Sequence, residues 1–150
     1  MELAGSHLAL ARDDEAIAVY ARILESYPSY VPALNNIAWL HRDKDRTKAM
    51  EYAQRAQNLA PTDPDVLDTL AMLTLKGGDR LRAYNLIREA AQRAPDRPEI
   101  QMHLATILLE REQRAEAQQV LRTVVEKFPK SAEARQAREL LEQSGARTSK

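Results

Sequence analysis

Four prolines divide the chain into segments of nearly equal length. Pro28, Pro61, Pro95 and Pro129 stand 33, 34 and 34 residues apart. A fixed period of this size is typical of a repeat made of one helix-turn-helix unit, which buries its apolar face against its neighbours. Such an array is all-α and presents an extended surface. The spacing therefore favours a binding protein over an enzyme.

The segment 64–97 shows the unit most clearly. Apolar residues recur at helical spacing over its first half, until Gly77 and Gly78 interrupt them. Glycine suits a helix end because it tolerates the positive φ that such an end often needs. Asp79 can then cap a second helix by accepting free backbone N–H groups. Pro95 ends that helix, because proline cannot continue the hydrogen-bond ladder.

The same frame recurs along the chain and predicts a single domain over residues 1–143. Its parts are a truncated repeat at about 2–30, full repeats at 31–63, 64–97 and 98–131, a capping helix at 131–143, and a flexible tail at 144–150. In the truncated repeat, we expect the acid pair Asp13 and Asp14 in the inter-helix turn. Ser131 is a suitable N-cap for the last helix.

This pattern resembles the tetratricopeptide repeat (TPR) family. Its signature is leucine and a small residue, followed by alanine, an apolar residue, alanine and proline at fixed offsets; in segment 64–97 these are Leu70, Ala71, Ala83, Ile87, Ala90 and Pro95. The resemblance covers residues 2–131 and implies a right-handed superhelical solenoid of antiparallel helical hairpins. Only Gly78 keeps the turn glycine of the family, whereas Ala11 and Glu112 replace it elsewhere.

Composition and motifs exclude several classes of function. The 22 basic and 22 acidic side chains give no net charge, and Arg80, Arg82, Arg88 and Arg93 are read as interleaved with acids, so no nucleic-acid footprint is expected. The chain has no cysteine and no apolar stretch long enough to span a membrane.

Motifs of catalysis and cofactor binding are also missing. There is no HExxH, no phosphate-binding glycine loop and no nucleophile elbow. His7 and His41 occupy equivalent places in neighbouring repeats, about one helix diameter apart, which is too far to share a metal ion. We therefore expect no enzyme activity, no cofactor and no metal site.

The resemblance also implies where a partner binds, because TPR ligands usually lie in the concave groove lined by the leading helices. The matching positions are Asn35, Asn36, Trp39, Arg42, Asp65, Asp68, Met72, Leu75, Met102, Thr106 and Leu109. The apolar members would form a strip that provides affinity, and Asp65, Asp68 and Glu99 an acidic rim that selects basic segments. Two alternatives stay open: the acids stabilise helix N-termini, and Trp39 packs within the array.

One TPR function is excluded. Modules that grip the acidic tails of heat-shock chaperones use lysine, asparagine and arginine in a carboxylate clamp. Asn36 fits the asparagine place, but Asp65 and Thr69 stand at the basic places. An acid there would repel a carboxylate.

A second resemblance concerns the runs PALNNIAWL and LAPTDPDVLDTLAMLTLKGGD. They are similar to the last repeats of bacterial TPR proteins linked to PEP-CTERM sorting and exopolysaccharide systems, which are often exported lipoproteins. This resemblance implies a periplasmic or membrane-associated location; without it, the cytoplasm is expected.

The sequence therefore predicts a non-enzymatic module that holds a protein or peptide segment, and no nucleic acid, in its concave groove. The alternative is a structural segment of a longer array. In that case an uncapped N-terminal end at Leu3, Leu8 and Leu10 would stack on upstream repeats or on a second copy of the chain.

Overall fold

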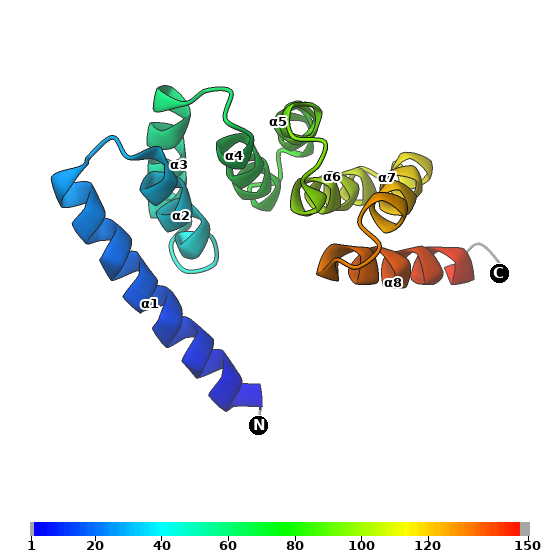
Figure 1. The fold of residues 1–150 in the computed structure, drawn as a ribbon, viewed down its shortest axis with the longest axis horizontal. Coiled ribbons are helices and arrows are strands. Elements are labelled where there is room, and N and C mark those ends of the chain that lie inside the picture. The colour runs from blue at the N-terminus through cyan, green and yellow to red at the C-terminus, as the bar shows by residue number, and fades with distance from the viewer. Residues whose placement is uncertain (1, 148–150) are drawn as a thin grey trace. The chain divides into compact units, whose positions relative to one another are not determined.

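The computed structural model describes residues 2–147, and side chains from Arg12 to Ser144. The described chain contains eight α-helices and no strand, in agreement with the predicted all-α helical repeat (Figure 1). The helices are α1 Glu2–Ser26, α2 Val31–His41, α3 Arg46–Leu59, α4 Pro64–Lys76, α5 Arg80–Arg93, α6 Pro98–Glu110, α7 Arg114–Lys127 and α8 Ala132–Arg147.

The helices form two compact units, Met1–Leu73 and Thr74–Lys150. The first unit holds α1 to α3 and most of α4, and the second holds the end of α4 and α5 to α8. The single domain over residues 1–143 and the right-handed superhelix stay predictions, because both depend on how the units are placed.

Side-chain caps set the start of several helices. The carboxylate of Asp79 accepts the backbone N–H of Arg82 at 3.0 Å, and the hydroxyl of Ser131 accepts that of Ala134 at 3.0 Å. Both predicted caps are therefore confirmed. Asp45 caps α3 in the same way, accepting the N–H of Lys48 at 3.1 Å. Each bond satisfies a backbone donor that has no partner inside its helix.

The predicted turn at Asp13 and Asp14 is wrong, because α1 continues without a break from Glu2 to Ser26. In two later repeats the turn contains a residue with positive φ, Gly78 at +89° and Glu112 at +62°. Ala11 stands at that place in the first repeat, and alanine is the strongest helix former. The acid pair instead lies beside the turn after α2, where Lys44 Nζ is 2.8 Å from Asp14 Oδ1 and 4.0 Å from Asp13 Oδ2.

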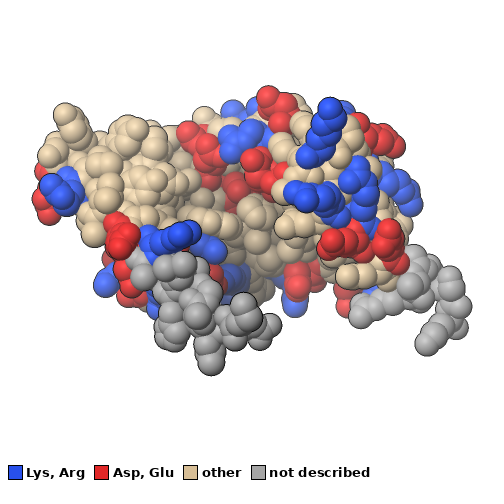
Figure 2. Space-filling view, turned by 60° about the horizontal axis from the view of Figure 1, so that its bottom comes forward, with Lys and Arg blue, Asp and Glu red and all other residues tan. Residues whose placement is uncertain are grey.

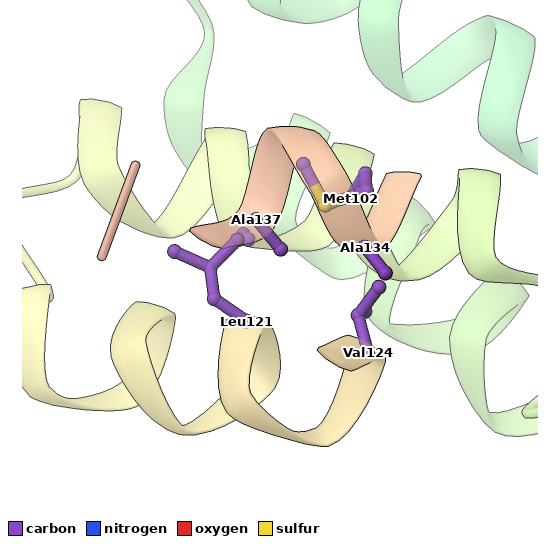
Figure 3. Close-up of a cluster of buried hydrophobic side chains, with 6 residues drawn as sticks. Met102, Leu121, Val124, Ala134 and Ala137 are labelled. Carbon is purple, nitrogen blue, oxygen red and sulfur yellow. The ribbon is translucent and has the colours of Figure 1, made fainter. Parts of the chain in front are cut away.

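The last three helices pack around a shared apolar cluster. Met102, Ala105, Leu121, Val124, Ala134 and Ala137 form it, and α8 contributes the last two (Figure 3). The predicted capping helix is therefore present. It extends past its predicted end at residue 143 to Arg147, so the predicted tail begins inside the helix. Residues 148–150 of that tail lie outside the described residues, as do the side chains of Leu3, His7, Leu8 and Leu10.

Alanines let paired helices approach closely. Ala38 and Ala49 in the first unit, and Ala105 and Ala117 in the second, have no exposed surface. A larger side chain at such a crossing would push the helices apart. These inward positions build the scaffold and leave the outward positions free to differ between repeats.

Candidate partner-binding surfaces

The residues predicted to line one groove belong to both units. Seven lie in the first unit, on α2, on α4 and in the turn after α2: Asn35, Asn36, Trp39, Arg42, Asp65, Asp68 and Met72. Four lie in the second unit, on α4 and α6: Leu75, Met102, Thr106 and Leu109.

The surface around α2 is uncharged. No charged residue occurs between Glu25 and Arg42. In Figure 2, a broad area without Lys, Arg, Asp or Glu lies in the left half of the view, where the α1–α2 connection and α2 lie, with charged residues at its left and lower edges. Such a surface favours contacts that are apolar or made by neutral hydrogen-bonding groups.

Trp39 is half-buried in this surface and is absent from the fully buried core. The guanidinium of Arg42 lies 4.4 Å from the centre of its ring, and Arg42 Nη1 donates to the Trp39 carbonyl at 2.8 Å. Arg42 is itself held by Asp43, with 3.2 Å between Nε and Oδ2. The ring is thus fixed by a cation–π contact and keeps part of its surface accessible.

Asn35 and Asn36 lie one turn before Trp39 on α2, and both are half-buried. The side-chain oxygen of Asn35 is buried and has no hydrogen-bond partner in the described part of the chain. A buried acceptor without a partner is costly. This oxygen has almost no accessible surface, so a bound segment does not reach it in this conformation.

On α4, the positions of Asp65, Asp68 and Met72 recur every three or four residues and so share one side of the helix. Asp65 is exposed, and the other two are half-buried. Thr69, which stands at a basic place of the carboxylate clamp, is only 4% exposed. The side of α4 toward solvent therefore carries negative charge beside an apolar methionine.

In the second unit, Met102 does not line an open groove as the sequence predicted. It is 7% exposed and belongs to the apolar cluster covered by α8 (Figure 3). The two small residues Ala134 and Ala137 let α8 pack closely over this part of α6. Thr106 is half-buried and its hydroxyl donates to the Met102 carbonyl at 3.0 Å, so it is partly used within α6.

Leu75 and Leu109 are both half-buried. Leu109 lines a cavity of about 470 Å³ together with residues of α7 and α8. Its apolar walls are Leu109, Leu121 and Leu140, and Arg114, Gln118, Gln143 and Ser144 supply polar groups. The sequence did not indicate this cavity, because it depends on where α8 lies against α6 and α7.

A basic surface on α5 was also missed. Its arginines are not interleaved with acids as the sequence analysis predicts, because α5 holds one acid, Glu89, beside Arg80, Arg82, Arg88 and Arg93. Glu89 is paired with Arg93 at 2.8 Å. The helix therefore carries a net positive charge of three, and this could have been counted from the sequence once the helix bounds were known.

The two units differ in charge although the chain has none overall. Residues 1–73 contain 7 basic and 11 acidic side chains, a net charge of −4, and residues 74–150 contain 15 basic and 11 acidic side chains, a net charge of +4. The neutral chain therefore consists of two units of opposite net charge.

One carboxyl group has a shifted pKa. The backbone N–H of Lys48 donates to Asp45 and holds the pKa of this carboxyl below its ordinary value, and the positive charge of Lys48 acts in the same direction. This is the usual effect of an N-cap, where the charged form accepts the hydrogen bond. The shift serves the start of α3 and indicates no catalytic group.

The described residues contain no group of three or more His, Cys, Asp or Glu side chains able to hold a metal ion. Over the same part of the chain, no helix is long and apolar enough to cross a membrane.

Comparison with known proteins agrees with this architecture. Models of the tetratricopeptide repeat match residues 1–64 and residues 74–141, which together are most of the chain. A search of curated proteins finds no match.

Solved structures are similar in fold. The crystal structure of MamA aligns at 16% identity and a TM-score of 0.68, over 97% of this chain and 86% of that one. PilF of Pseudomonas aeruginosa aligns at 18% identity and a TM-score of 0.72, over 95% and 73%. MamA residues 41 to the end, from Desulfovibrio magneticus RS-1, align at 15% identity and a TM-score of 0.66, over 83% and 71%.

These likenesses establish a shared fold. That fold is a scaffold for protein–protein interaction, and proteins built on it are generally non-enzymatic. The repeats, the capping helix and the family matches agree, and the chain belongs to the tetratricopeptide repeat family.

Proposed function

We propose that the first unit binds a segment of a partner protein along α2 and α4. Trp39 is the anchor of this surface. The observation that supports this role is that Trp39 is half-buried, contacts the guanidinium of Arg42 and is not part of the core. Tryptophan in such a setting offers a large apolar area at little entropic cost, as binding hot spots do.

Polar and charged residues of the first unit define the class of partner. Asn35 lies one turn before Trp39 on α2 and is half-buried, and an amide can both donate and accept hydrogen bonds. Asp65 and Asp68 add negative charge on α4, and the unit as a whole carries a charge of −4. The partner segment therefore combines an apolar side chain with lysine or arginine. Met102 takes no part, because α8 covers it.

Affinity capture with two matched baits tests this proposal. Trp39→Ala should weaken binding of the captured partner by about 2 kcal/mol or more, which is about 30-fold. Tyr27→Ala is the control, since Tyr27 is a 69% exposed aromatic residue of the same unit in the connection before α2. Mass spectrometry should find a protein retained by the native chain and by the Tyr27 variant and lost from the folded Trp39 variant. Equal retention by all three would remove Trp39 from the site.

The alternative function, a structural segment that stacks on further repeats or on a second copy, predicts a different result. Light scattering would then show a mass that rises with concentration, and Trp39→Ala would not change it. The proposed link to exopolysaccharide secretion rests on the sequence resemblance alone.

A further inference from the structure

We propose that the second unit has its own binding groove, between α5 and α7, for an acidic segment that carries an apolar anchor residue. This groove differs from the surface on α2 and α4 in position, in charge and in the partner it selects. It does not rest on the function proposed for the first unit.

The groove is centred on Tyr84 of α5, whose ring is flanked by two arginines. The guanidinium carbon of Arg111 lies 4.7 Å from the ring centre, and that of Arg88 lies 5.6 Å from it. Arg111 is held further by its Nε, which donates to the Gln113 side chain at 2.6 Å. One ring thus keeps two cations in place beside the groove.

The two cations differ in what else they contact. Arg111 donates to the Gln113 amide, which in turn donates to Glu116, whereas Arg88 makes its contact with the ring of Tyr84. Neither guanidinium forms an ion pair with any acid in the part of the chain that the structure describes. Arg93, by contrast, is neutralised by Glu89 at 2.8 Å on the same helix. A planar guanidinium fixed in this way is suited to pair with a carboxylate through two parallel hydrogen bonds.

Beside the cations lies an apolar floor. A cavity of about 300 Å³ is lined by Tyr84 and Arg88 of α5, by Leu104 and Leu108 of α6, and by Val120 of α7. Leu108 is buried, whereas Leu104 and Val120 are half-buried and present apolar surface to the cavity. A volume of this size holds one large apolar side chain.

One acid also lines the cavity. Glu116 of α7 accepts a hydrogen bond from Gln113 Nε2 at 3.0 Å, and the same Gln113 side chain accepts from Arg111, so this acid lies on the side of Arg111. A carboxylate of the ligand is attracted most strongly to Arg88 and is repelled by Glu116. Charge complementarity therefore selects a segment whose acid lies toward Arg88 and whose apolar residue enters the cavity.

Fluorescence anisotropy with two designed peptides tests the proposal. One probe is a fluorescein-labelled peptide of alternating glutamate and leucine, and its control replaces glutamate by lysine. The Trp39→Ala variant, which lacks the anchor proposed for basic segments in the first unit, should bind the glutamate peptide and bind the lysine peptide at least about ten-fold more weakly, with an affinity for the former that falls as salt is raised. Equal binding of both peptides would overturn the proposal.

Matched double variants locate the binding. R88Q with R111Q removes two charges from the groove, and R82Q with R122Q removes two exposed arginines that line neither the cavity nor the ring of Tyr84. We expect about a ten-fold or greater loss of affinity for the glutamate peptide in the first pair alone. An equal loss of affinity in both double variants would show that the peptide is attracted by net charge only, and the proposed binding groove would be rejected.

Circular dichroism of the variants shows whether each one folds. Trp39→Ala should leave the affinity for the glutamate peptide unchanged, because Trp39 belongs to the other unit. The experiments can therefore contradict the groove proposal and the function proposed for the first unit independently of each other. A loss of glutamate-peptide binding on Trp39→Ala would contradict a second, independent site.

Discussion

The two units of this protein share one scaffold and differ in the chemistry of their surfaces. Both contain helical pairs closed by fully buried alanines, such as Ala38 and Ala49 in the first unit and Ala105 and Ala117 in the second. Toward solvent, the first unit presents an uncharged helix with a fixed tryptophan, whereas the second presents a basic helix with a tyrosine between two arginines. The repeat determines the fold, and the outward positions determine what is bound.

The largest expected effect tests whether both scaffolds depend on their cores to the same degree. Leu34 in the first unit and Leu121 in the second are at most 1% exposed. Leu34→Ala and Leu121→Ala should each lower the free energy of unfolding by about 2–5 kcal/mol, because each leaves a cavity. Leu81→Ala, at a 61% exposed position, serves as control in urea denaturation and should change it by less than about 0.5 kcal/mol. Destabilisation by only one of the two substitutions would show that the two units do not depend equally on their cores.

A second prediction compares one turn position in two repeats. Gly78→Ala should destabilise the protein by about 1–2 kcal/mol, since φ is +89° and an added Cβ meets no atom within 4 Å, so that the cost lies in the backbone. Glu112→Gly should stabilise it by about 0.5 kcal/mol, because glycine adopts a φ of +62° without strain. Thermal denaturation of both variants measures whether each substitution raises or lowers the melting temperature. A change in the same direction for both would contradict backbone strain at this turn position.

A smaller effect is expected at the start of α8. Ser131→Ala removes the hydroxyl that accepts the N–H of Ala134 and should cost about 1 kcal/mol. Ser131→Asn should restore most of this loss, because asparagine caps equally well. Urea denaturation of the three proteins provides the measurement. An alanine variant as stable as the native chain would show that packing of Ala134 and Ala137 alone holds the capping helix.

The smallest effect concerns pH. Asp45 has a pKa below its ordinary value in the folded protein, so it binds protons less readily there than in the unfolded chain. Its contribution to stability is therefore present above the ordinary carboxyl pKa and is lost as pH falls through the lowered value. Asp45→Asn should keep the cap and reduce this loss between neutral and strongly acidic pH. Melting curves of the native chain and the variant over that pH range provide the measurement. An equal loss of stability in both proteins would show that Asp45 is not a source of the pH dependence.

The sequence predicted the features that repeat. The helical hairpin repeat, the caps Asp79 and Ser131, and the presence of the capping helix were all correct, because each follows from local chemistry. The turn at Asp13 and Asp14 was wrong, because alanine at the glycine place lets α1 continue.

Features that depend on packing between elements could not be predicted in the same way. The burial of Met102 depends on where α8 lies, and the pairing of Arg88 and Arg111 around Tyr84 joins α5 to the turn after α6. Position within a repeat identifies which residues face outward, but it does not show which of them a later helix covers.

Selection from a displayed peptide library can find ligands of both surfaces, because it requires no known partner. The native chain, Trp39→Ala and the R88Q with R111Q variant would each be used as bait. Two groups of peptides are expected: apolar and basic sequences that the Trp39 variant loses, and apolar and acidic sequences that the arginine variant loses. A single group retained equally by all three folded baits would contradict the claim that the two units present two distinct binding surfaces.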